Sequence, residues 1–132
     1  MKTTFASTAV LLLTALSIYA SDALTEKEYN AICRAGISAL YYKPLEIVKT
    51  INRKEETVYI SYVRPSDSKT WHYKCKITGN RILWGTKDGR WRTHQLDEAV
   101  YYTYDSKTKK VTIEVKYPNS SDKTDYQLTD VD

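Results

Sequence analysis

The stretch KTWHYKCKI, Lys69 to Ile77, alternates polar and apolar side chains from Thr70 onward. Successive side chains of a β-strand point to opposite faces of the sheet, so this alternation predicts a strand with one apolar and one polar face. The apolar face carries Trp71, Tyr73, Cys75 and Ile77. The polar face carries Thr70, His72, Lys74 and Lys76.

The other cysteine, Cys33, lies in a segment with the periodicity of a helix. Apolar or small residues recur there at intervals of three and four, which places them on one stripe of a helix. They are Tyr29, Ile32, Cys33, Gly36, Ile37, Leu40 and Tyr41. Thr25 and Glu28 have the spacing of a capping box, and Pro44 disfavours helical structure in the residue before it. We predict one amphipathic helix over residues 25–42.

The helix and the strand are expected to pack with their apolar sides together, which brings Cys33 close to Cys75. The cysteine pattern and both hydrophobic patterns then agree, and we predict a disulfide between these two residues. Closing a loop of this length stabilises a small domain by about 4 kcal/mol. Two cysteines without histidines at ligand spacing make a poor zinc site, so no metal centre is predicted.

After Pro44 the apolar residues recur with a period near two, and short turn-like segments separate the apolar runs. Short connections favour antiparallel neighbours. The predicted fold is therefore α+β, with one N-terminal amphipathic helix packed on an antiparallel meander sheet of six or seven strands. The strands are expected at residues 45–52, 57–63, 71–77, 81–86, 97–104, 109–117 and 124–128.

The first 23 residues have the layout of a secretory signal peptide. Lys2 precedes an apolar run, Ala9 to Ile18, and small residues follow it, so cleavage is predicted after Ala20 or Ala23. The run is about half of the roughly 20 residues that span a bilayer, so no membrane span is predicted. Residues 24–132 are expected to form a single domain, periplasmic or secreted, in a compartment that permits a disulfide.

Basic residues are concentrated in one part of the chain. The whole sequence has 20 Lys and Arg against 16 Asp and Glu, an excess too small to predict a nucleic acid partner. Between Arg64 and Arg92, however, eight Lys or Arg stand against two Asp, and all three tryptophans fall in the same interval. We predict a binding protein that contacts an acidic protein or an anionic envelope polymer through a basic sheet face.

At the end of this interval, the stretch GRWRTH, Gly89 to His94, places two arginines, a tryptophan and a histidine within six residues. If it is extended, Trp91 points to one face and its basic neighbours to the other, which predicts Trp91 in the core and the basic side chains on the surface. Ion pairs with Asp88, Asp97 or Glu98 are the competing role for the two arginines. The predicted binding residues are Arg90, Arg92 and His94, together with His72, Lys74 and Lys76.

Two alternative functions follow from other residues. The sequence has no nucleophile elbow, glycine-rich phosphate loop or cofactor motif, so no catalytic residue and no cofactor is predicted. If the protein were a small hydrolase or ribonuclease, His72 and His94 would be its acid and base. Eleven of the twelve tyrosines follow the signal peptide. They suggest a carrier with a tyrosine-lined ligand cavity between helix and sheet.

Overall fold

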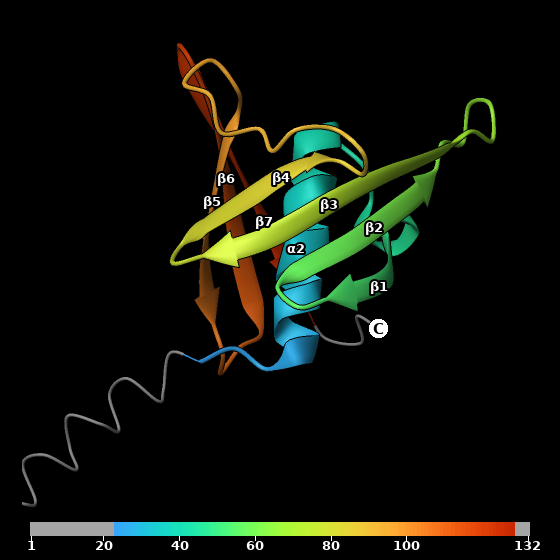
Figure 1. Ribbon diagram of the computed structural model, residues 1–132. Coiled ribbons are helices and arrows are strands. Elements are labelled where there is room, and N and C mark those ends of the chain that lie inside the picture. Colours follow the sequence, from blue (N-terminus) through green and yellow to red (C-terminus); the bar gives the residue numbers. More distant parts are fainter. Residues whose placement is uncertain (1–22, 129–132) are drawn as a thin grey trace, which may run out of the picture.

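The computed structural model describes residues 23–128 (Figure 1). It contains helix α2 (Glu26–Tyr41), the short 3-10 helix η1 (Leu45–Ile47) and seven strands. The strands are β1 (Lys49–Lys54), β2 (Thr57–Val63), β3 (Thr70–Thr78), β4 (Arg81–Thr86), β5 (Ala99–Asp105), β6 (Lys110–Tyr117) and β7 (Ser120–Gln127). They form one antiparallel sheet in which each strand pairs with the next, so the predicted meander is confirmed.

Parts of the predicted signal peptide fall outside this range, since residues 1–22 are not among the described residues. Within residues 23–128, no helix combines the length and the apolar character that crossing a membrane requires.

Helix α2 begins and ends where local chemistry favours it. The Thr25 hydroxyl accepts a hydrogen bond from the Glu28 N–H (3.1 Å), and the Glu28 carboxylate accepts one from the Thr25 N–H (2.9 Å). This is the predicted capping box. At the other end Tyr42 adopts a left-handed conformation (φ 54°), and the Lys43 N–H donates to the Ser38 carbonyl at 2.9 Å. The helix therefore ends at Tyr41, three residues before Pro44.

The sheet curves around the helix. Figure 1 shows α2 behind β2, β3 and β4, while β5 to β7 run across the side at a steep angle to them. The change of direction falls between β4 and β5, which pair only as Arg81 with Tyr101 and Ile82 with Val100. The core fills the space between helix and sheet. Its large side chains that are fully buried include Ile32, Ile37, Ile60, Ile82 and Ile113.

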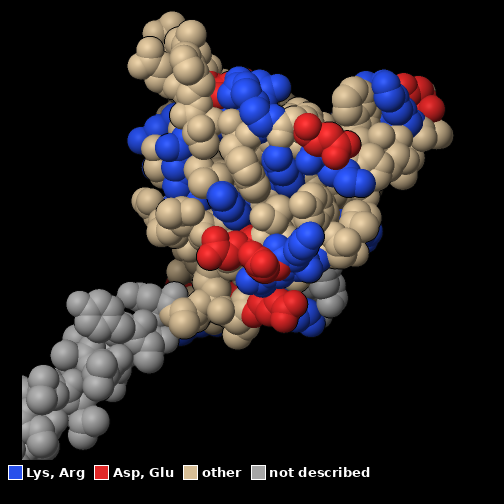
Figure 2. Space-filling model, viewed as in Figure 1, with Lys and Arg blue, Asp and Glu red and all other residues tan. Residues whose placement is uncertain are grey.

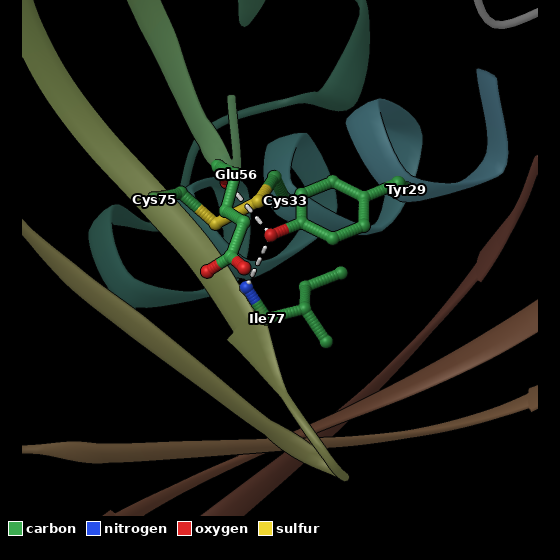
Figure 3. The surroundings of a disulfide bond; sticks show 5 residues. All are labelled: Tyr29, Cys33, Glu56, Cys75 and Ile77. Carbon is green, nitrogen blue, oxygen red and sulfur yellow. Dashed lines mark hydrogen bonds between the residues drawn. A yellow bond between two sulfur atoms is a disulfide. The ribbon is translucent and has the colours of Figure 1, made fainter. Parts of the chain in front are cut away.

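The Cys33–Cys75 disulfide joins the buried side of α2 to β3, as predicted. The two Cα atoms are 5.9 Å apart, and both residues are fully buried. Beside the disulfide, the Tyr29 hydroxyl accepts from the Ile77 N–H (2.8 Å) and donates to the Glu56 carbonyl (2.7 Å) (Figure 3). Tyr29 thus joins the end of β3 to the turn between β1 and β2.

Tyr29→Phe is expected to lower the free energy of unfolding by about 1–3 kcal/mol, because the Ile77 N–H and the Glu56 carbonyl both lose their partner. Urea denaturation measures the loss. Tyr101→Phe is the matched control, since the Tyr101 hydroxyl makes no hydrogen bond within residues 23–128. Equal stability of the two variants would contradict the bridging role of Tyr29.

The predicted boundaries of the first and the last strand are wrong. Residues 45–47 form η1 instead of the start of a strand, and β1 continues to Lys54, so the predicted turn at 53–56 is shorter. Buried Arg34 explains the first difference, because its guanidinium donates to the carbonyls of Leu45 (3.0 Å) and Val48 (2.5 Å) and so binds this segment to the helix. The last strand starts at Ser120, earlier than residue 124. Since β7 is an edge strand and almost entirely exposed, its residues show no apolar alternation.

Candidate binding face

The outer face of β1 to β4, which points away from the helix, is basic. Alternation and register place five Lys or Arg on it, and these four strands contain no Asp or Glu. Figure 2 shows basic side chains over the middle of this face, with acidic ones in separate groups. The five cations are Lys49, Lys54, Lys74, Lys76 and Arg81.

The segment between β4 and β5 lies against this outer face. The Arg92 N–H donates to the Trp84 carbonyl (2.8 Å), and the Lys74 ammonium donates to the Gly89 carbonyl (2.6 Å). A Cβ on Gly85 would lie 2.6 Å from the Arg90 carbonyl oxygen, so only glycine at position 85 permits this approach. Because β5 pairs only with the first residues of β4, the rest of β4 has room beside it, and this segment lies there.

Trp91 is held on the outer face by two lysines. The ammonium nitrogen of Lys74 lies 4.8 Å from the centre of the Trp91 ring, and that of Lys76 lies 4.6 Å away. Each such contact stabilises by about 0.5–1 kcal/mol at an exposed site. We call Lys74, Lys76 and Trp91 the lysine–tryptophan row.

The prediction that Trp91 belongs to the core is wrong. Trp91 and Arg92 do point to opposite faces, but Trp91 lies on the outer face and Arg92 points toward the core. The Arg92 guanidinium lies 5.6 Å from the ring of Trp84, which is buried in the core. The reason is that the segment lies alongside β4, so its contacts with β4 decide which side chains face the core. The alternation within GRWRTH contains no information on those contacts.

Arg90 and Arg92 are both engaged by Asp97. The Arg90 guanidinium donates to both carboxylate oxygens (2.8 and 3.0 Å), and Arg92 lies 3.5 Å from one of them. The Asp97 side chain, only 9% exposed, also accepts from the His94 N–H at 3.0 Å. Hydrogen bonding by Arg90, and then the His94 N–H, holds the pKa of Asp97 well below its usual range. The competing role considered for the arginines, an ion pair with Asp97, is present.

The lowered pKa of Asp97 predicts how this segment responds to acid. A carboxyl group whose pKa is depressed by folding stabilises the fold above its ordinary pKa, about 3.9, and the contribution is lost as the pH falls through the depressed value. The amide resonances of Arg90 to Arg92 are expected to respond below about pH 4, and Asp97→Asn should abolish this response. A response below about pH 4 that survives Asp97→Asn would contradict the assignment.

The two histidines lie in separate surroundings. His94 is in a turn, where its Nδ1 accepts from the Leu96 N–H at 3.1 Å. His72 is exposed on β3, and its carbonyl accepts from the Lys87 N–H at 3.1 Å. No contact joins them within the described residues, and that part of the chain contains no cluster of three or more His, Cys, Asp or Glu able to hold a metal ion.

His72 borders a hollow of about 300 Å³ beside the lysine–tryptophan row. We call it the Tyr59 hollow. Its side chains come from β1, β2, β3 and the turn after β4: Ile51, Asn52, Tyr59, His72, Lys87 and Asp88. Asn52 and Tyr59 were not among the predicted binding residues. Alternation places Tyr59 on the polar face of its strand, but only the strand register brings it next to Lys74.

Several tyrosines fill the space between helix and sheet. The Tyr41 ring centre lies 4.6 Å from that of Tyr73 and 6.0 Å from that of Trp84, and Tyr62 stacks on Tyr73 at 5.9 Å. Burial, aided by the neighbouring tyrosine hydroxyls, raises the pKa of Tyr73. These rings pack against one another as part of the core. A different hollow, of about 540 Å³, lies near the start of α2 beside Tyr102 and Tyr104.

Comparisons of the chain with protein families, with curated proteins and with solved structures gave no significant match.

Proposed function

We propose that the protein binds an anionic macromolecule through the outer face of β3 and the segment between β4 and β5. The observation that carries the proposal is the lysine–tryptophan row. Two ammonium groups lie against one half-buried indole, on four strands that contain no carboxylate.

The charges of Lys74 and Lys76 are available to a partner. Neither lysine forms an ion pair within residues 23–128, whereas Arg90 and Arg92 share Asp97. The two lysines are therefore the residues of the site that we expect to pair with an anionic partner. The arginines act mainly by fixing the segment that carries Trp91.

The lysines are also held in place before a partner arrives. Lys74 donates to the Gly89 carbonyl, and both ammonium groups lie over the Trp91 ring. Ordering a flexible side chain costs about 0.5–1.5 kcal/mol on binding, so side chains that are already ordered bind more tightly.

The alternative functions have less support. A hydrolase would need His72 and His94 at one site, and no contact joins their surroundings within the described residues. A carrier would need a cavity between helix and sheet; Tyr41, Tyr62 and Tyr73 fill the middle of that space, and the hollow beside Tyr102 and Tyr104 lies at its end, near the start of α2. Binding through the outer face requires neither that the two histidines meet nor that the core opens.

The experiment is a binding titration with immobilised dextran sulfate and polyglutamate at low and moderate salt. Lys74→Ala/Lys76→Ala is expected to weaken binding to at least one of these polymers by about tenfold or more, since each exposed charge contact contributes up to about 1 kcal/mol. Binding of the unaltered protein should weaken as salt rises, because exposed charges are screened.

Lys116→Ala/Lys123→Ala is the matched control. It makes the same change in net charge at two exposed lysines of β6 and β7. Equal losses for the two double variants would mean that net charge alone governs binding and would contradict a site at the lysine–tryptophan row. Binding that is indifferent to salt would contradict it as well.

A further inference from the structure

We infer that the anionic partner is an acidic polysaccharide, with one sugar unit in the Tyr59 hollow and its acidic groups along the lysine–tryptophan row. This inference rests on the proposed function and adds the chemical class of the partner.

The hollow and the row form one continuous surface. Asn52 pairs with Tyr59 across β1 and β2, and Tyr59 pairs with Lys74 across β2 and β3. Neighbouring strands are about 4.8 Å apart, so these three side chains stand side by side on the outer face. The Lys87 N–H bond to the His72 carbonyl fixes the opposite wall, which carries Lys87 and Asp88.

The size and composition of the hollow suit a sugar. Its volume, about 300 Å³, lies at the small end of the range for ligand sites, which fits one ring of a polymer better than a large separate ligand. The Tyr59 ring is half-buried, and the apolar C–H face of a sugar ring stacks on such aromatic surfaces.

The polar groups of the hollow match hydroxyl groups, which both donate and accept. The Asn52 amide donates and accepts, the Asp88 carboxylate accepts, and the Lys87 ammonium donates. None of these three side chains has a hydrogen-bond or ion-pair partner within residues 23–128. A sugar with several adjacent hydroxyls could satisfy all three.

Asp88 also distinguishes among polyanions. A carboxylate beside the binding face repels phosphate or carboxylate groups, but it accepts hydrogen bonds from hydroxyls. The surface therefore favours a polymer in which hydroxyl-rich units carry acidic groups. It disfavours a chain whose every unit exposes a charge without a hydroxyl, such as polyglutamate.

A peptide partner has a second disadvantage on this surface. Extended peptides gain affinity by pairing their backbone with a strand edge. Strands β2 and β3 are paired on both sides, so the centre of the face offers only side chains to a partner.

Calorimetric titration of the protein with four probes of matched length tests the inference. The probes are oligogalacturonate, the neutral oligogalactose, oligoglutamate and single-stranded oligothymidylate. Oligogalacturonate is expected to bind at least about tenfold more tightly than each of the others. Tyr59→Ala and Asn52→Ala should each weaken its binding by about tenfold, while Tyr101→Ala, an outward tyrosine of β5, should leave it unchanged.

The outcomes separate the inference from the proposed function. Binding of oligoglutamate or oligothymidylate as tight as that of oligogalacturonate, with sensitivity to Lys74→Ala/Lys76→Ala, would overturn the inference and leave the proposed function standing. Oligogalacturonate binding that ignores both Tyr59→Ala and Asn52→Ala would also overturn it. If none of the charged probes binds, both the inference and the proposed function are overturned. Asn52 is exposed, so its replacement tests the hollow even if Tyr59→Ala does not fold.

Discussion

Replacing both cysteines, in Cys33→Ala/Cys75→Ala, is expected to lower the free energy of unfolding by about 4 kcal/mol. The disulfide joins residues 42 positions apart, and a cross-link over such a loop removes much of the conformational freedom of the unfolded chain. Domains of this size are stable by about 5–15 kcal/mol in total. The variant should therefore be folded at low temperature and lose much of its margin on warming.

Urea denaturation of the variant, and of the unaltered protein with and without a thiol reductant, measures this effect. A loss under about 1 kcal/mol would mean that helix–sheet packing alone holds α2 in place, against the expectation for such a loop. Binding should survive at low temperature. Cys75 points into the core, whereas Lys74 and Lys76 point to the outer face of the same strand, so stability and binding are expected to separate.

Gly85→Ala is expected to move the segment that carries Trp91 and to lower the free energy of unfolding by about 1–3 kcal/mol. The new Cβ would lie 2.6 Å from the Arg90 carbonyl oxygen and 3.3 Å from the Lys74 Cε. The first contact is with backbone, which must shift as a whole. Since Trp91 follows Arg90, its position over the two lysines should change and binding of the anionic polymer should weaken.

Gly36→Ala is the matched control for Gly85→Ala. A Cβ on Gly36 would lie 3.0 Å from the Cδ1 and 3.2 Å from the Cγ2 of buried Ile82, so this variant also overpacks the interior, but on the helix side of the sheet. Its stability should fall by a similar amount, whereas its binding should not change. Unchanged amide resonances for Arg90 to Arg92 in Gly85→Ala would contradict the close approach at Gly85.

The parts of the fold that follow from local pattern could be predicted from sequence. The alternation in KTWHYKCKI assigned the faces of β3 correctly, and the period of α2 placed Cys33 on its buried side. The disulfide followed because those two patterns had to meet. Gly79, with a φ of 60°, lies in the tight turn between β3 and β4, where glycine adopts the left-handed conformation without strain.

The candidate site could be predicted only in part, because it depends on contacts between distant segments. Lys74 and Lys76 were found from the polar face of one strand. The contribution of Tyr59 needed the register of β2, and the position of Trp91 needed the path of the segment after Gly85. Asp97 was one of three carboxylates that the sequence offered as a partner for Arg90, and the sequence gave no reason to choose among the three.

A second tryptophan with basic neighbours provides the sharpest alternative for the binding site. At the outer end of β2 and β3, Arg64 and Lys69 lie 5.1 and 4.8 Å from the ring centre of Trp71. Arg64 forms an ion pair with Asp67, and this contact lowers the pKa of the Asp67 carboxyl group to about 2. The two tryptophan clusters differ in their charge: within residues 23–128, neither lysine of the lysine–tryptophan row forms an ion pair, whereas Arg64 pairs with Asp67.

Mapping amide chemical-shift changes during titration with dextran sulfate distinguishes these two clusters directly. The proposed function predicts the largest changes at residues 72–76 and 87–92, with little change at residues 63–71. Lys74→Ala/Lys76→Ala should remove the changes at both predicted segments. The largest changes at residues 63–71, or changes spread evenly over the basic residues of the whole sheet, would contradict a binding site on the lysine–tryptophan row.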